Sequence, residues 1–220
     1  MRRILIGFIL GMFGLIISAG ATPVKTEHVE AELVSEVQTI QPGRPFWVGV
    51  RLRMQPEWHV YWRNAGDAGL PTTITWQLPE GFQGGEIQWP YPIRFKLDDF
   101  VNFGYEDEVL LLTRITPPAT LSPGQKVQLR ANVEWLVCKD ICVPESAELT
   151  LELPVAEAAR INSRWVEAFA ETRAKLPLKQ SEWRVEATIQ DTTLVIVATP
   201  PAWFRGNFSS LLFFPYPEGI

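Results

Sequence analysis

The chain has 220 residues, 46% of them hydrophobic and nine of them tryptophan, so it is long and apolar enough to form a folded core. Its formal net charge is −5, and the basic residues form no cluster. This charge pattern argues against nucleic acid and against anionic lipid surfaces as partners.

The first 21 residues have the layout of a secretory signal peptide. Arg2 and Arg3 precede an uncharged apolar run over residues 4–17, and small residues follow it. The run is shorter than the ~20 residues that span a bilayer comfortably, which favours a cleaved signal over the alternative of an uncleaved anchor. We therefore expect an exported chain that starts near Thr22, in a compartment where disulfides form.

Residues 22–154 have the pattern of short strands separated by Gly and Pro turns. Period-two alternation or β-branched enrichment marks strands at 46–54, 58–63, 72–78 and 109–115. The longest alternation covers 127–137, and 147–153 repeats it after two cysteines, which predicts an antiparallel hairpin with the cysteines at its tip. The pattern predicts an all-β fold, an immunoglobulin-like β-sandwich.

An aromatic stretch interrupts this pattern between residues 90 and 105. Prolines, a glycine and charged residues surround its aromatic side chains, which are Tyr91, Phe95, Phe100, Phe103 and Tyr105. Such composition predicts a long loop, and long loops are usually functional or mobile. The alternative is that the loop only places its aromatic rings in the core.

The pattern changes after Pro154. Residues 156–176 favour a helix, within a linker over 155–180, with one face formed by Ile161, Trp165, Ala168, Phe169 and Thr172. A hairpin is predicted for 183–189 and 194–198, and a further strand for 211–214. We expect residues 181–220 to begin a second β domain that continues in a longer protein.

Cys138 and Cys142 are the only cysteines of the sequence. In an exported chain they are expected to bond to each other, although a ring of about five residues contributes only roughly 2 kcal/mol of stability. Four extended residues span about 13 Å, whereas a disulfide needs Cα atoms roughly 4.4–6.8 Å apart, so the chain must turn between the cysteines. A tight, accessible ring is predicted to be easily reduced, which favours a redox role, with a passive staple as the alternative.

Two further alternatives use neighbouring residues. The Cys-x-x-x-Cys spacing followed by a proline also resembles copper-chaperone loops of the Sco type, and thiolates suit Cu(I). A third copper ligand would come from His28, expected to be solvated, His59, expected at the surface or packed, or Met54, expected in the core. A sugar-binding platform is the other alternative, although the alternating positions of its candidate residues favour packing. Those residues are Trp58, Trp62 and Trp89.

Several ordered motifs resemble the N-terminal periplasmic domain of the DsbD/ScsB family of thiol:disulfide interchange proteins, in its ScsB-like branch. The motifs are Trp58-His-Val-Tyr-Trp-Arg-Asn-Ala-Gly-Asp-Ala-Gly-Leu-Pro71, Trp89-Pro-Tyr-Pro-Ile-Arg-Phe95, Asn102-Phe-Gly-Tyr-Glu106 and Trp135-Leu-Val-Cys-Lys-Asp-Ile-Cys-Val-Pro-Glu145. The resemblance covers roughly residues 29–153 and is only loose beyond Pro154. It implies an immunoglobulin-like domain ahead of a transmembrane electron-carrying domain, in an inner-membrane protein.

The resemblance also implies an activity, a protein-disulfide reductase. Electrons would leave the membrane domain through Cys138 and Cys142 and reach periplasmic thioredoxin-like or disulfide isomerase proteins, among them cytochrome c maturation and copper-resistance proteins. The domain itself would need no metal, flavin or nucleotide. An aromatic cap loop shields the cysteines in the better-known branch, and its hypothetical counterpart here is formed by Phe95, Phe100, Phe103 and Tyr105. The sequence leaves open which cysteine attacks.

Overall fold

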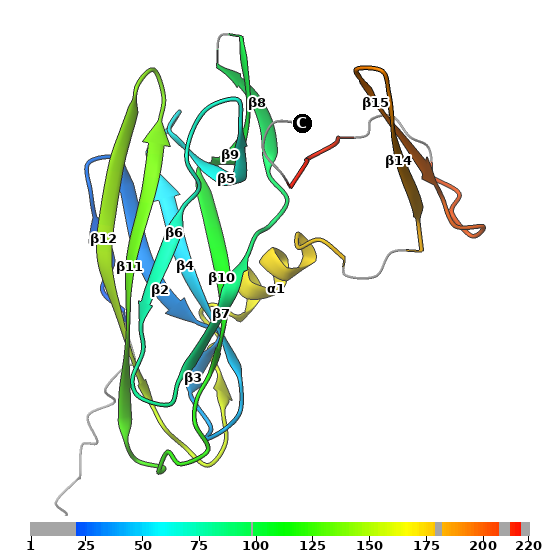
Figure 1. Ribbon diagram of the computed structural model, residues 1–220. Helices are drawn as coiled ribbons and strands as arrows, with labels where there is room; N and C mark the ends of the chain where they lie inside the picture. Colours follow the sequence, from blue (N-terminus) through cyan, green and yellow to red (C-terminus); the bar gives the residue numbers. More distant parts are fainter. Residues whose placement is uncertain (1–20, 98, 179–181, 207–211, 217–220) are drawn as a thin grey trace, which may run out of the picture.

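The computed structural model describes residues 21–97, 99–178, 182–206 and 212–216. The predicted signal peptide, residues 1–21, lies outside the described residues except for its last position. Figure 1 shows two sheets stacked against each other, with the helix α1 beside the sandwich and a separate hairpin, β14–β15, farther along the chain.

The first sheet has the strand order β1-β2-β4-β10-β7. All of its strand pairs are antiparallel. Its strands are β1 (Val24–Lys25), β2 (Val29–Ser35), β4 (Phe46–Met54), β7 (Gln83–Gln88) and β10 (Glu108–Thr116).

The second sheet has the order β12-β11-β5-β9-β8, and β6 pairs with β11 beside this path. Its strands are β5 (His59–Gly66), β6 (Thr73–Gln77), β8 (Ile93–Leu97), β9 (Phe100–Glu106), β11 (Lys126–Cys138) and β12 (Cys142–Pro154). The β5–β9 pairing shifts register between Tyr61 and Gly66. We call this six-stranded sheet the cysteine sheet, because it carries both cysteines.

Alternating side chains of the two sheets form the core between them. Along β11 the odd-numbered residues from Val127 to Val137 are buried, and Ala147, Leu149, Leu151 and Leu153 of β12 are buried beside them. They belong to one cluster with residues of the first sheet such as Leu33, Val50 and Leu52. The predicted all-β sandwich is confirmed, since period-two burial on both sheets encloses one apolar layer.

The predicted loop over residues 90–105 is wrong, because most of this stretch forms the hairpin β8–β9. Pro90 and Pro92 precede β8 and therefore remove no hydrogen bond from the ladder. The aromatic residues Phe103 and Tyr105 alternate into the core, and both are buried. The composition suggested irregularity, but the burial of these rings stabilises a strand.

The predicted helix is shorter than expected and begins later. Residues Arg160–Ile161 form β13, which pairs with β3 (Val37–Thr39), and Ile161 is exposed instead of lying on the packed helical face. The helix α1 covers Val166–Ala174. Its Phe169 is completely buried in a second cluster with Val34, Leu110 and Leu112, so the helix docks on the outer face of the first sheet.

The predicted second hairpin is confirmed as β14 (Arg184–Gln190) and β15 (Thr193–Thr199), with Asp191 at a positive φ of 55° in the turn. The strand predicted for 211–214 is not formed by residues 212–214, and residue 211 lies outside the described residues. Phe214 instead packs edge-on against Trp62 and Phe103, next to a proline that cannot donate to a ladder. The described residues contain no helix of the length and apolar character that a bilayer crossing requires.

Candidate active site

The two cysteines lie at the tip of the hairpin formed by β11 and β12. The strands pair without a break from Lys126↔Pro154 to Cys138↔Cys142. The last pair is joined by a disulfide with a Cα–Cα distance of 4.1 Å, and the N–H of Lys139 donates to the carbonyl of Ile141 to close the turn. The predicted hairpin tip is therefore confirmed, and its two long strands hold the sulfur atoms at one end of the cysteine sheet.

The two cysteines differ in their access to solvent. Cys138 is completely buried, in a small cluster with Tyr61 and Ala65 on the outer face of the cysteine sheet. Cys142 is exposed. A reacting thiol must reach a sulfur atom along the S–S axis, so Cys142 is the accessible end of the disulfide.

A buried tyrosine and histidine of β5 lie beside the disulfide. The hydroxyl of Tyr61 lies 3.6 Å from Cys142 Sγ and 3.4 Å from His59 Nε2. Burial lowers the pKa of His59 and raises the pKa of Tyr61. At neutral pH the hydroxyl therefore keeps its proton and can donate it in a hydrogen bond to sulfur.

Sequence reasoning did not assign Tyr61 to the site and placed His59 at the surface or in packing. His59 is in fact buried, and it is the direct cross-strand partner of Cys138. Both residues belong to the Trp58–Pro71 motif that carries the family resemblance. That motif was the available signal, because alternation alone does not show which strand lies beside the cysteines.

The four aromatic residues proposed as a cap have different positions. Phe95 is half-buried, its ring centroid lies 4.3 Å from that of His59, and it packs on the cluster that contains Cys138. Phe103 and Tyr105 are part of the core between the sheets, and the hydroxyl of Tyr105 donates to the carbonyl of Pro90. Phe100 is exposed at the start of β9. Of the four, Phe95 is the residue that the structure places in the cysteine cluster.

Residues of the disulfide ring border a hollow of about 560 Å³. The hollow is lined by Glu27, His28, Trp58, Lys139, Asp140, Ile141 and Val143. Lys139, inside the ring, forms an ion pair with Glu57, and this contact raises the pKa of Lys139 and lowers the pKa of Glu57. The ammonium of Lys139 is thus paired with the carboxylate of Glu57.

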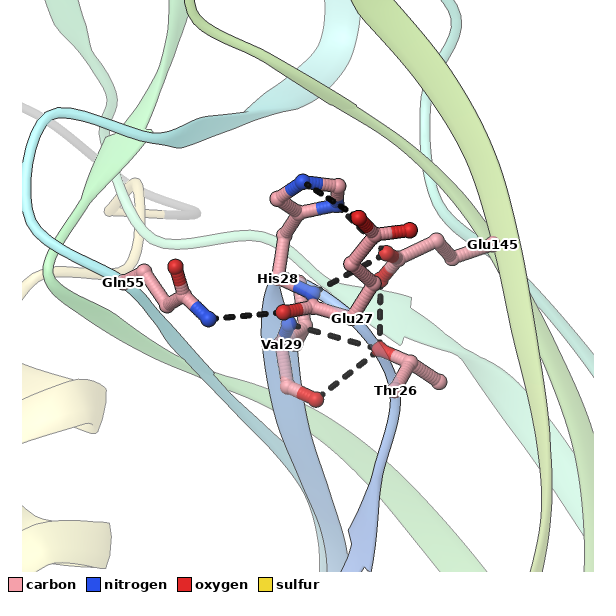
Figure 2. Close-up of polar contacts among 6 residues, drawn as sticks. All are labelled: Thr26, Glu27, His28, Val29, Gln55 and Glu145. Carbon is pink, nitrogen blue, oxygen red and sulfur yellow. Dashed lines mark hydrogen bonds and ion pairs between the residues drawn. The ribbon is translucent and has the colours of Figure 1, made fainter.

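A polar cluster anchors β12 three residues after Cys142. Figure 2 shows the carboxylate of Glu145 pointing at Thr26 and His28, which lie between β1 and β2. The carboxylate accepts hydrogen bonds from the Thr26 hydroxyl and the His28 N–H, and its Oε1 lies 2.7 Å from His28 Nδ1. This contact joins the cysteine hairpin to the other sheet.

Comparison with known proteins identifies the family of the chain. A family model described as "Thiol:disulfide interchange protein DsbD, N-terminal" matches residues 27–154, the segment that contains both cysteines and every strand of the two sheets except β1. The chain belongs to this family. The search of curated proteins found no match.

A solved structure also resembles the chain, the N-terminal periplasmic domain of ScsB from Proteus mirabilis. The TM-score is 0.62 at 16% sequence identity, and the match covers 83% of this chain and 70% of that one. At this identity the likeness establishes the fold. It extends over more of the chain than the DsbD family model does.

Of the candidate third copper ligands in this DsbD-type domain, His59 lies beside the cysteines, whereas His28 and Met54 are packed elsewhere. His28 is not solvated as expected, because it stacks on Trp58 at 3.7 Å and contacts Glu145. Met54 lies in the core, as expected. Over the described ranges, no three His, Cys, Asp or Glu residues are grouped as a metal site.

The candidate sugar platform is also used for packing in the DsbD-type fold. Trp62 is buried, while Trp58 and Trp89 are half-buried and pack against the same core cluster. The prediction that these rings pack is confirmed.

Proposed function

We propose that this domain passes electrons from a membrane-embedded partner domain to periplasmic disulfide proteins through Cys138 and Cys142. Membership in a thiol:disulfide interchange family supports the chemistry. The observation that carries the assignment of residues is the disulfide at the hairpin tip, with Cys142 exposed and Cys138 buried. The electron donor would be a transmembrane domain, expected in the same inner-membrane polypeptide, and the acceptors would be thioredoxin-like or disulfide isomerase proteins.

The exchange would proceed through a mixed disulfide. In the reduced domain the Cys142 thiolate attacks one sulfur of the partner disulfide, a new S–S bond forms, and the partner's other sulfur leaves as a thiolate. Cys138 then attacks Cys142 Sγ and releases the partner's first sulfur. The partner gains two electrons and two protons, and the domain returns to the disulfide form.

The residues beside the disulfide would support this chemistry. The protonated hydroxyl of Tyr61 is placed to donate a hydrogen bond to the Cys142 thiolate, which stabilises the nucleophile. Phe95 covers His59 and, through it, one side of the cluster around Cys138. Cys138 is buried next to Cys142, which favours its role as the resolving cysteine.

The first test is the reduction potential of the cysteine pair. The exported chain is equilibrated against glutathione or dithiothreitol and the thiols are trapped. A value within roughly −270 to −120 mV, the range of known exchange proteins, is expected for an electron relay. A value well below about −300 mV would identify a structural disulfide and contradict the proposal.

The second test assigns the roles of the cysteines. The Cys138→Ser variant retains the exposed Cys142 and should trap a mixed disulfide with an oxidised thioredoxin-like protein. The matched Cys142→Ser variant should trap far less, because Cys138 is buried. Equal trapping by both variants would contradict the assignment. Preferential trapping by the Cys142→Ser variant, which retains Cys138, would reverse it. Transfer of electrons from the reduced wild-type domain to that partner tests the direction.

A further inference from the structure

The loop formed by residues 66–71, called the 66–71 loop below, lies over the ring of Tyr61. Gly69 has a φ of +112°, and a Cβ at this position would lie 2.4, 2.5 and 2.6 Å from the ring atoms Cε1, Cζ and Cδ1. These distances are far inside van der Waals contact, so only glycine lets the backbone lie this close to the ring. The hydroxyl of the same ring lies 3.6 Å from Cys142 Sγ.

Paired hydrogen bonds hold this loop against β9. The N–H of Asp67 donates to the carbonyl of Val101 at 3.0 Å, and the Asp67 carboxylate accepts from the N–H of Val101 at 2.7 Å. The N–H of Ala68 donates at 3.1 Å to the side-chain oxygen of Asn102, which is completely buried. Reciprocal bonds at Asp67 and a buried acceptor at Asn102 fix the position of the loop over the sheet.

Both ends of the loop are also anchored. Gly66 has a φ of +89°, and a Cβ there would lie 2.3 Å from the carbonyl oxygen of Val101. At the other end Pro71 forms a parallel bridge with Tyr61 itself. The loop is therefore held between β9 and the strand that carries Tyr61, with Gly69 on the ring between these anchors.

We propose that the 66–71 loop is a positioning element for the thiol chemistry, in which Gly69 holds the ring of Tyr61 so that its hydroxyl donates a hydrogen bond to the Cys142 thiolate. This inference rests on the proposed function of the cysteine pair. Gly69 and Asp67 touch neither sulfur. They act through Tyr61 and are positioning residues.

Charged and titratable groups lie on the two elements next to the accessible sulfur, the strand β5 and the disulfide ring. His59 and Tyr61 come from β5, and Lys139 and Asp140 come from the disulfide ring. The Lys139 ammonium is ion-paired with Glu57. The Tyr61 hydroxyl contacts Cys142 Sγ directly. Displacing this hydroxyl should therefore change the pH midpoint of Cys142 alkylation more than removing a neighbouring charge does.

The test follows the alkylation of Cys142 by iodoacetamide in the reduced exported chain, as a function of pH, with mass spectrometry to separate the two cysteines. Tyr61→Phe removes the donor, and Gly69→Ala pushes the ring away. Each is expected to shift the pH midpoint of Cys142 alkylation upward by about one unit, which corresponds to about tenfold slower alkylation near pH 7. The double variant should match Tyr61→Phe alone, because Gly69 acts through the hydroxyl that is already missing.

Gly124→Ala is the matched control. Gly124 also has a positive φ, +90°, but no atom lies within 4 Å of its built Cβ, so the substitution adds the same kind of backbone strain away from the site. It should leave the midpoint unchanged. Asp67→Ala releases the loop without a clash and should shift the midpoint in the same direction, which keeps the test valid if Gly69→Ala does not fold.

Three results would overturn the inference. The first is a wild-type midpoint in a folded Gly69→Ala or Asp67→Ala variant, and the second is a Gly69→Ala shift that adds to that of Tyr61→Phe. The third is a wild-type midpoint in Tyr61→Phe. Failure of the proposed function is distinguishable, because it would appear as absent electron exchange with a thioredoxin-like protein while the midpoint shifts persist.

Discussion

His28 Nδ1 lies 2.7 Å from Glu145 Oε1, which joins the turn before β2 to the strand that starts at Cys142. The side chains of His28 and Glu145 are only 12% and 7% exposed. The same carboxylate also accepts from the Thr26 hydroxyl and the His28 N–H. The cysteine end of the hairpin is thus tied to the opposite sheet by one buried acceptor.

Glu145→Ala is expected to lower the free energy of unfolding by roughly 2–3 kcal/mol, because it leaves the donors of Thr26 and His28 without their charged acceptor. Urea denaturation of the oxidised chain measures this change. Glu148→Ala, at an exposed position of the same strand, is the control and should change stability little. Equal effects of the two substitutions would show that the cluster does not support the fold.

Selective alkylation should distinguish the two cysteines in the reduced protein. Cys142 is exposed and Cys138 is buried, so Cys142 is expected to react at least about tenfold faster with iodoacetamide. Peptide mass spectrometry after short labelling measures both rates. Urea-unfolded protein provides the control, in which the rates should converge. Equal rates in the folded state would contradict the assigned accessibility.

Phe95→Ala should accelerate reduction of the disulfide by dithiothreitol, because the ring packs on His59 and on the cysteine cluster. Stopped-flow measurement of the reduction rate tests this. Phe100→Ala is the matched control, since Phe100 is exposed on the same hairpin. An unchanged rate in Phe95→Ala would remove the cap role of Phe95.

Phe103→Ala should instead lower the free energy of unfolding by about 3–5 kcal/mol, because its ring belongs to the core.

His59 should make stability depend on pH below about 6.5. Burial lowers the pKa of His59 in the folded state, so the unfolded chain takes up a proton first as the pH falls. The contribution of neutral His59 to stability is complete at pH values above the pKa that His59 has in the unfolded chain. It is lost progressively as the pH falls below that pKa. The loss of unfolding free energy between pH 7.5 and 5.5 should be up to about 1 kcal/mol larger in wild type than in His59→Gln. Equal losses in urea titrations would contradict a neutral, buried His59.

Phe169→Ala tests whether α1 is part of the folded unit. The ring is completely buried against Val34, Leu110 and Leu112, so its removal should lower the free energy of unfolding by about 3–5 kcal/mol. Leu178→Ala, at a position that is 81% exposed, is the control. If both variants unfold like wild type, the helix does not contribute to the stability of the sandwich. The domain boundaries at residues 154 and 180 stay predictions.

Two segments have structures that their local sequence did not predict. Tyr91 to Tyr105 looked irregular because prolines and charges surround its rings, yet pairing with β5 and burial of Phe103 produce a hairpin. Ile161 matched a helical face by spacing, but it lies in β13 and is exposed. In both segments pairing with a distant strand outweighed local composition. A short window of sequence does not show which distant strand will pair with it.

The sequence by itself determined the cysteine hairpin, the family and the sandwich strands β4, β5, β6, β10, β11 and β12, because alternation and motif order are local properties of the chain. Only the tertiary structure decided which residues surround the sulfur atoms. Tyr61 precedes Cys142 by 81 positions and His28 precedes Glu145 by 117, and neither contact follows from period-two patterning. Alternation assigns each side chain to a face of its strand. The packing of strands, loops and sheets then decides which side chains meet on that face and which cysteine stays open to solvent.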